Sequence, residues 1–121
     1  MTIEKKTWND AESDCVKMGA HLASIHSAEE NDFVNKLHDP TGVHNIWIGG
    51  IKDGNSFKWN DNSAFNYQNW NTFNKEPNNS GGKEDCVELY SRPGKNYDGK
   101  WNDIPCDIAT RGDRYVCKKR K

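Results

Sequence analysis

The chain opens with two stretches whose apolar residues recur at helical spacing. In the first, from Thr7 to Met18, Thr7 is placed to cap a helix and Gly19 to end it. The second starts at a capping box, Ser27 to Glu30, whose hydroxyl and carboxylate can satisfy the first backbone N–H groups. Its expected apolar face consists of Phe33, Val34 and Leu37. The pattern therefore predicts two helices early in the chain.

Strand patterns lie between and after these helices. Short apolar or alternating runs predict strands at residues 20–25, 46–51, 86–90, 100–101 and 114–118. Gly49 and Gly50 indicate close backbone packing within the second of these strands. The sum is an α+β fold in which two helices pack on short antiparallel sheets.

A polar stretch from Asp53 to Lys83 separates the early elements from the late strands. A connection this long is usually either functional or disordered. Aromatic residues are spread along it, which favours an ordered loop region that packs on itself: Phe57, Trp59, Phe65, Tyr67, Trp70 and Phe73. We expect most of the tryptophans to fill the core instead of forming a binding platform.

Length and composition bound the architecture. The 121 residues fit one domain, residues 1–121, with a single core. That core is thin, since 33% of residues are hydrophobic and the mean hydropathy is −1.07. Five tryptophans partly offset the deficit because each can bury a large apolar area.

The charge balance argues against nucleic acid as a partner. Seventeen Lys and Arg against 18 Asp and Glu give a formal charge of −1, so no basic excess attracts nucleic acid. The basic run from Lys118 to Lys121 is expected to be a solvated tail. No apolar run is long enough to span a membrane, and no signal peptide is recognisable. We expect the sequence to be part of a longer chain.

The cysteines indicate an oxidising compartment. Cys15, Cys86, Cys106 and Cys117 are even in number, and no C-x-x-C pair suggests a zinc or redox site. Two disulfides in a secreted or extracellular protein are the expected arrangement, and the spacing leaves three connectivities open.

The chemistry is concentrated in a short window of oxygen-bearing side chains. Carboxylates and carboxamides alternate there without a suitable Cys or His, which favours a hard cation with oxygen ligands, above all Ca²⁺. Each of these residues alone could be an ordinary solvated loop residue. The candidate ligands are Glu76, Asn78, Glu84, Asn102 and Asp103.

The order of motifs resembles the C-type lectin domain over nearly the whole chain. Trp8, Ala11 and Cys15 with Gly19 look like the family's first helix, and the tetrapeptide at 47–50 resembles its core motif, with a Gly where Leu is more usual. The late sequences Glu-Asp-Cys-Val (84–87) and Trp-Asn-Asp-x-x-Cys (101–106) match as well. An ordered set is far more specific than any one tripeptide.

The resemblance implies both structure and function. It implies the disulfides Cys15–Cys117 and Cys86–Cys106, and it assigns the five candidate ligands to the family's principal Ca²⁺ site. Bound sugar would coordinate the ion through two adjacent hydroxyls and exchange hydrogen bonds with the same five side chains. In the family, Glu-Pro-Asn, here residues 76–78, accompanies mannose, N-acetylglucosamine and fucose. The implied partners are mannose-type glycans on cell or microbial surfaces, with clustering of domains supplying avidity.

An auxiliary calcium site is less well supported. Asp53 and Asp85 could contribute, but Asn79 stands where the family usually has a carboxylate, and each missing charge weakens a hard-cation site. We expect one principal calcium and at most a weak second.

Two short motifs overlap this picture. Asn78-Asn79-Ser80 fits the N-glycosylation pattern, and a glycan there would occupy a proposed ligand, so we expect the site to be unmodified. Arg111-Gly112-Asp113 spells an integrin-type tripeptide, for which a solvated turn is the simpler interpretation.

Two other functions compete with sugar binding. A protein-interaction or adhesion module could use the same fold with calcium serving only to shape the loops. An enzyme could use Glu76 and Glu84 as a glycosidase pair, but carboxylates committed to a cation cannot readily act as proton donor and nucleophile. No nucleophile and base pairing is suggested either, so we predict no catalysis.

Overall fold

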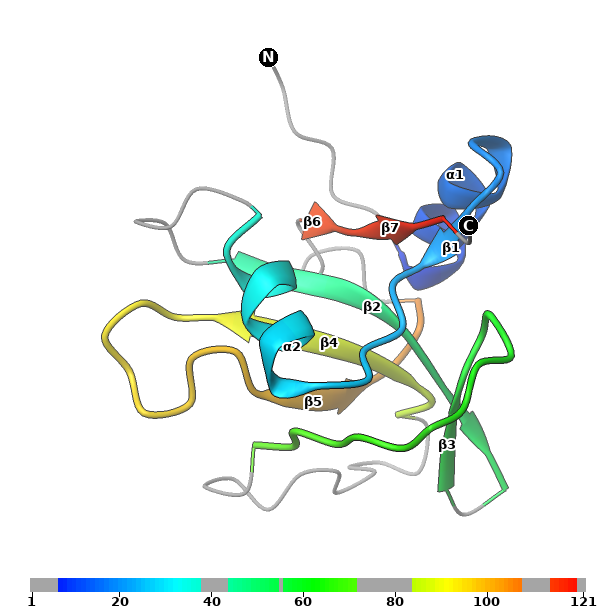
Figure 1. Ribbon diagram of the computed structural model, residues 1–121. Helices are drawn as coiled ribbons and strands as arrows, with labels where there is room; N and C mark the ends of the chain where they lie inside the picture. Colours follow the sequence, from blue (N-terminus) through cyan, green and yellow to red (C-terminus); the bar gives the residue numbers. More distant parts are fainter. Residues whose placement is uncertain (1–6, 38–43, 55, 72–83, 108–113, 120–121) are drawn as a thin grey trace.

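The protein is described here by a computed structural model that covers residues 7–37, 44–54, 56–71, 84–107 and 114–119 (Figure 1). No helix in these ranges is long and apolar enough to cross a bilayer. The described residues form two helices and seven strands. In chain order these are α1 (Trp8–Lys17), β1 (His21–Leu22), α2 (Ala28–Asn35), β2 (His44–Asp53), β3 (Ser56–Trp59), β4 (Cys86–Ser91), β5 (Trp101–Ile104), β6 (Arg114–Tyr115) and β7 (Cys117–Lys118).

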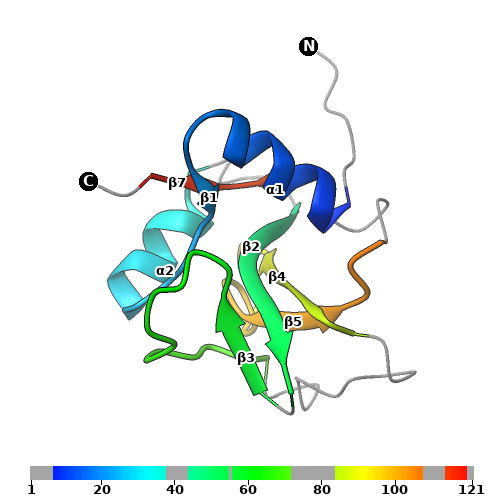
Figure 2. The same ribbon diagram turned by 90° about the vertical axis from the view of Figure 1, so that its right-hand side faces the viewer.

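The strands form two sheets. The larger has the order β3-β2-β4-β5 with antiparallel neighbours, and β6 joins β2 in parallel. The smaller pairs β1 with β7, which brings the carboxyl-terminal strand beside the strand that follows α1 (Figures 1 and 2). α2 lies across one face of the larger sheet (Figure 1). The predicted α+β architecture is confirmed.

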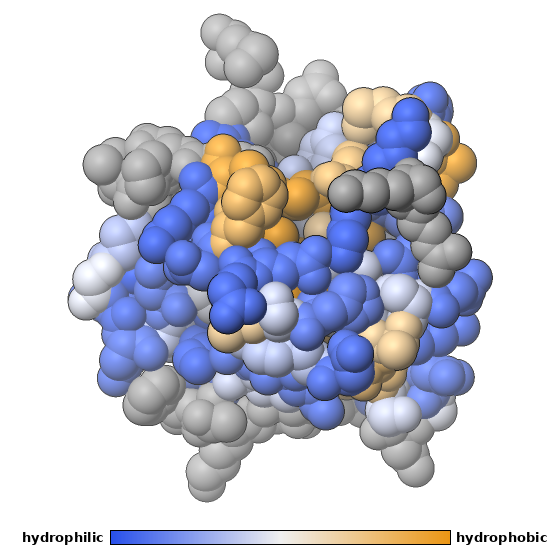
Figure 3. Space-filling view, viewed as in Figure 1, coloured by the Kyte–Doolittle hydropathy of each residue, from blue (hydrophilic) through white to orange (hydrophobic). Residues whose placement is uncertain are grey.

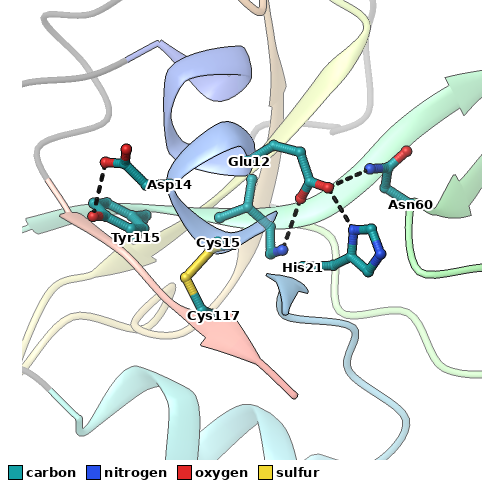
Figure 4. The surroundings of a disulfide bond; sticks show 8 residues. Glu12, Asp14, Cys15, His21, Asn60, Tyr115 and Cys117 are labelled. Atoms are coloured by element: carbon teal, nitrogen blue, oxygen red, sulfur yellow. Dashed lines mark hydrogen bonds and ion pairs between the residues drawn. A yellow bond between two sulfur atoms is a disulfide. The ribbon is translucent and has the colours of Figure 1, made fainter. Parts of the chain in front are cut away.

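The carboxylate of Glu12 joins helix α1 to β1 and to the segment after β3. Both oxygens of Glu12 are engaged: Oε1 accepts from the backbone N–H of Leu22 at 2.8 Å, and Oε2 contacts His21 Nδ1 and Asn60 Nδ2 (Figure 4). At the amino-terminal end, the predicted cap is present, since the Thr7 hydroxyl accepts from the backbone N–H of Asp10. One side chain of α1 thereby fixes β1 and the segment after β3.

The disulfides are those implied by the family resemblance. Cys15–Cys117 ties α1 to β7 across a sequence separation of 102, and Cys86–Cys106 ties the start of β4 to the segment after β5. Closing a loop of about 100 residues restricts the unfolded chain and is worth roughly 4–5 kcal/mol in the chain-entropy model. The second disulfide closes the β4–β5 unit, which carries the candidate ligands Asn102 and Asp103.

Helix α2 does not bury the face predicted from its sequence. Its cap is confirmed, because the Ser27 hydroxyl accepts from the backbone N–H of Glu30. Of the three apolar residues, however, only Val34 is buried, while Phe33 is 65% exposed and Leu37 48% exposed. Apolar side chains accordingly gather on the surface over the carboxyl-terminal ends of α1 and α2 (Figure 3).

Polar contacts explain why α2 is rotated in this way. Asn31 donates from Nδ2 to the Gly99 carbonyl at 2.9 Å and accepts from the Trp101 indole at Oδ1 at 2.7 Å. Asn35 donates to Asp98. These buried amides face the loop before β5. A helix rotated to bury Phe33 and Leu37 instead would break the hydrogen bonds of these amides.

The strand predictions were correct in location but incomplete. β3 was missed within the polar stretch; it forms a hairpin with β2 through the pairs Gly50↔Trp59 to Asp53↔Ser56. The expected strand at residues 20–25 shortens to β1, and the expected strand at 114–118 divides into β6 and β7. The aromatic residues of the polar stretch that are described here pack against the core, as expected; Phe73 lies outside the described residues.

A cluster of hydrogen bonds around Lys118 joins β7, α2 and the segment after β1. The ammonium donates to Glu30 Oε2 at 2.6 Å and to the Ser24 carbonyl at 3.1 Å. The Ser24 hydroxyl donates to Asp61 at 2.6 Å. Burial raises the pKa of Glu30, but hydrogen bonds from Lys118 and the His26 backbone outweigh it and leave that pKa below the ordinary value.

We expect Lys118→Met to destabilise the protein by about 1–2 kcal/mol at neutral pH, after allowance for partial exposure of the pair. Because the folded-state pKa of Glu30 is lowered, the contribution is complete above the unfolded pKa and is lost as the pH falls through the folded pKa. Urea unfolding of both proteins at neutral and acidic pH checks this. A stability difference that persisted unchanged in acid would contradict it. Lys36→Met, which removes the exposed pair with Asp32, is the control with little expected effect.

Candidate metal centre

Strand β5 carries two of the five candidate ligands on a rigid support. Trp101, its first residue, is fully buried and packs edge-on against Trp59, Tyr67 and Trp70 at centroid distances of 5.3–5.9 Å. The indole also donates to Asn31 in α2. The aromatic core therefore fixes the backbone from which the next two residues, the candidate ligands, project.

Asn102 and Asp103 are consecutive residues of β5, and both are buried. Asn102 pairs with Glu88 in the β4–β5 register, and Asp103 pairs with Val87. Asn102 is 4% exposed and Asp103 is 0% exposed. A carboxylate this deeply buried is costly unless positive charge or hydrogen bonds compensate it, so the surroundings of Asp103 must supply such partners.

The structure adds Glu88 to this group, a residue that was not predicted from the sequence. Its Oε2 accepts a 2.9 Å hydrogen bond from Asn102 Nδ2, which directs the amide oxygen of Asn102 away from β4. Glu88 is fully buried in a strand that is buried throughout. A charged residue in the middle of an apolar strand was the signal that could have identified it.

The remaining described candidates lie at the adjoining end of the sheet. Glu84 is half-buried and precedes β4 by two residues. Asp85 is exposed, and its carbonyl accepts from the Lys52 backbone N–H at 2.7 Å, which places it beside the end of β2 where Asp53 is exposed. The two possible auxiliary ligands thus belong to neighbouring strand ends.

Other predicted residues lie outside the part of the chain that the structure describes. These are Glu76, Asn78, Asn79 and the Arg-Gly-Asp tripeptide at 111–113. Within the described ranges, no three His, Cys, Asp or Glu side chains are grouped closely enough to hold a metal ion. The described residues therefore supply part of a ligand set, and the set is complete only if residues 76–78 join it.

The part that is described fits calcium chemically. Glu84 and Asp103 supply carboxylate oxygens and Asn102 an amide oxygen whose nitrogen is already held by Glu88. Mixed charged and neutral oxygen ligands are what Ca²⁺ accepts.

A short parallel contact extends the site beyond β5. Trp70 pairs with Trp101, and the backbone N–H of Asn71 donates to the Trp101 carbonyl at 2.9 Å. The segment before residue 71 runs alongside β5 in Figure 1. Asn71 thereby becomes the cross-strand neighbour of Asn102.

Comparison with known proteins gives the family. The model of the lectin C-type domain matches residues 4–119. The chain belongs to the C-type lectin domain family. Lactose-binding lectin l-2 of Anguilla japonica is 42% identical over 115 residues, covering 87% of this chain and 63% of that protein. The chain spans 52–64% of the length of the first three relatives it matches.

Solved structures agree on the fold. The carbohydrate-recognition domain of cow CD23, solved in the presence of a GlcNAc2Man3 oligosaccharide, has a TM-score of 0.75 at 34% identity, over 96% of this chain and 82% of that one. A calcium-independent type II antifreeze protein has a TM-score of 0.72 at 30% identity, over 88% and 75%. The same framework therefore occurs both in a carbohydrate-recognition domain and in a protein that is calcium-independent.

Family membership decides the question of catalysis. C-type lectin domains bind carbohydrate and are not enzymes, so the prediction of a non-catalytic lectin domain is confirmed. Members of the family generally use Ca²⁺.

Proposed function

We propose that this lectin domain, comprising the whole 121-residue chain, binds terminal mannose-type sugars in a calcium-dependent manner outside the cell. The observation that carries the proposal is the buried Asn102–Asp103 pair in β5, with the Asn102 amide nitrogen held by Glu88. This arrangement presents oxygen ligands from a strand that the core keeps rigid. The two disulfides support an oxidising, extracellular setting.

Each proposed ligand has a separate role. Glu76, Glu84 and Asp103 would balance the charge of the ion, and the amide oxygens of Asn78 and Asn102 would complete its coordination. Calcium would accept two adjacent sugar hydroxyls as ligands. The hydroxyl protons would be accepted by the carboxylates of Glu76 and Glu84, and the amides of Asn78 and Asn102 would donate to the hydroxyl oxygens.

The sugar preference rests on residues 76–78. Exchanging acid and amide on the two sides of the proline reverses which side donates hydrogen bonds, so Glu-Pro-Asn favours the hydroxyl arrangement of mannose, N-acetylglucosamine and fucose. The eel relative is named for lactose binding, which makes a galactose-containing sugar the necessary comparison. Single-site affinity is expected to be weak, and clustering of several domains would raise avidity.

Retention on immobilised mannose tests the proposal. We expect retention in calcium, release by a chelator, and no retention on immobilised lactose. Retention on lactose but not mannose would overturn the specificity, and retention that survives chelation would overturn the calcium dependence.

One finding favours a second function, a protein-interaction or adhesion module. The calcium-independent antifreeze protein shares this fold, so the framework can work without sugar coordination through an ion. The two functions differ in competition: free mannose should block the lectin and leave the interaction module unaffected.

A further inference from the structure

The buried side chain of Asn71 makes no hydrogen bond within the described residues. It is 0% exposed, and neither its amide oxygen nor its amide nitrogen has a hydrogen-bond partner in the described part of the chain. Buried carboxamides are ordinarily satisfied, because an unpaired one loses its hydrogen bonds to water and gains none in return. A bound ligand or an ordered water could supply the missing partner.

The position of Asn71 shows what that partner would touch. In the parallel contact, Trp70 lies opposite Trp101, so the following residues, Asn71 and Asn102, lie next to each other on the other face of the strands. Glu88 pairs with Asn102 on that same face. The three polar side chains form one row across neighbouring strands, which lie about 4.7–4.9 Å apart.

The hydrogen bond within this row sets its direction. Glu88 takes the amide nitrogen of Asn102, so the Asn102 oxygen is turned toward the Asn71 side of the row. A ligand bound through that oxygen would therefore meet the Asn71 carboxamide, which can both donate and accept.

We propose that Asn71 is a further binding residue of the site, whose carboxamide hydrogen-bonds a hydroxyl oxygen of the occupant. The inference rests on the proposed lectin function. The O–H group is either a hydroxyl on a ring carbon of the sugar or a water molecule bound to the cation. Both present a donor and an acceptor.

Asn71→Leu removes this hydrogen-bonding capacity while keeping similar volume, and Asn71→Ala serves if leucine overpacks the site. Calorimetric titrations with calcium chloride alone, and with methyl α-mannoside in saturating calcium, measure the two equilibria. Thermal unfolding in chelator measures the ligand-free fold. Asn35→Leu is the matched control, because Asn35 is a buried amide of α2 whose nitrogen donates to Asp98 and whose oxygen also lacks a partner, outside the proposed row.

We expect the Asn71 variants to unfold in chelator at the same or a higher temperature than the parent chain and to lose about five- to tenfold in affinity. A loss for mannoside alone assigns the hydroxyl to the sugar; a loss for calcium as well assigns it to a water on the ion. The Asn35 control should lose stability and keep both affinities.

Affinities of both Asn71 variants within twofold of the parent for both probes would overturn the inference. Failure of the parent chain itself to bind mannoside would reject the proposed function instead, and the calcium titration would then decide the role of Asn71. A parent chain that bound neither probe would overturn both.

Discussion

Asp103→Asn should abolish calcium-dependent retention on mannose while the protein remains folded. Asp103 is fully buried in β5, and its carboxylate is one of the two charged ligands proposed for the ion within the described residues. Removing one partner of a buried charge pair typically costs about 3–5 kcal/mol. That corresponds to a loss of at least about 100-fold in calcium affinity. Calcium titration calorimetry and the mannose column measure the two effects.

The matched control is Asp107→Asn, which removes the same charge from an exposed residue four positions further along the chain. It should leave calcium affinity and retention unchanged. Calcium affinity of Asp103→Asn within threefold of the parent chain would reject Asp103 as a ligand. Thermal unfolding of each variant in chelator separates loss of the ion from loss of the fold.

Gly49→Ala should destabilise the protein by about 3 kcal/mol or more, the upper range for overpacking. A Cβ at this position would lie 2.5 Å from the Leu22 carbonyl oxygen and 3.2 Å from that of Ala23. The Gly49 N–H also donates to the Ala23 carbonyl at 2.8 Å, so β2 cannot move away without losing that bond. The melting temperature should fall by roughly 10 °C, measured with the disulfides intact.

Gly50→Ala provides the comparison within the same strand. Its added Cβ would lie 2.6 Å from Cγ2 of Val87, a side-chain atom. Truncating Val87 to Ala should therefore recover part of the loss at Gly50 and none of the loss at Gly49. If Val87→Ala rescued both glycine variants equally, backbone contact would not be the cause at Gly49.

Several features followed directly from the order of residues. The caps at Thr7 and Ser27, the strands around Gly49 and Cys86, and the burial of Trp101 depend on local spacing and side-chain type, and each is present in the structure. The cysteine pairing was open from spacing alone and followed from resemblance to the family. The candidate ligands were likewise recognised by motif, and Asn102 and Asp103 prove to share one buried strand.

Other features depended on contacts between distant segments. α2 turns Phe33 outward because Asn31 meets residues 99 and 101, and neither contact is visible in the helix's own periodicity. β3 alternates polar and apolar residues over only four positions within a polar stretch, and it forms a strand by pairing with β2. Glu88 and Asn71 had no sequence signal as strong as a motif.

The sequence by itself determined the family, the elements near the caps and the residue types that can bind calcium, because those properties are local. The tertiary structure alone decided which polar residues stand in one row across β4, β5 and the segment before it, because strand register is set by packing of the whole core. Asn71, Asn102 and Glu88 are separated in sequence and become neighbours only through that register.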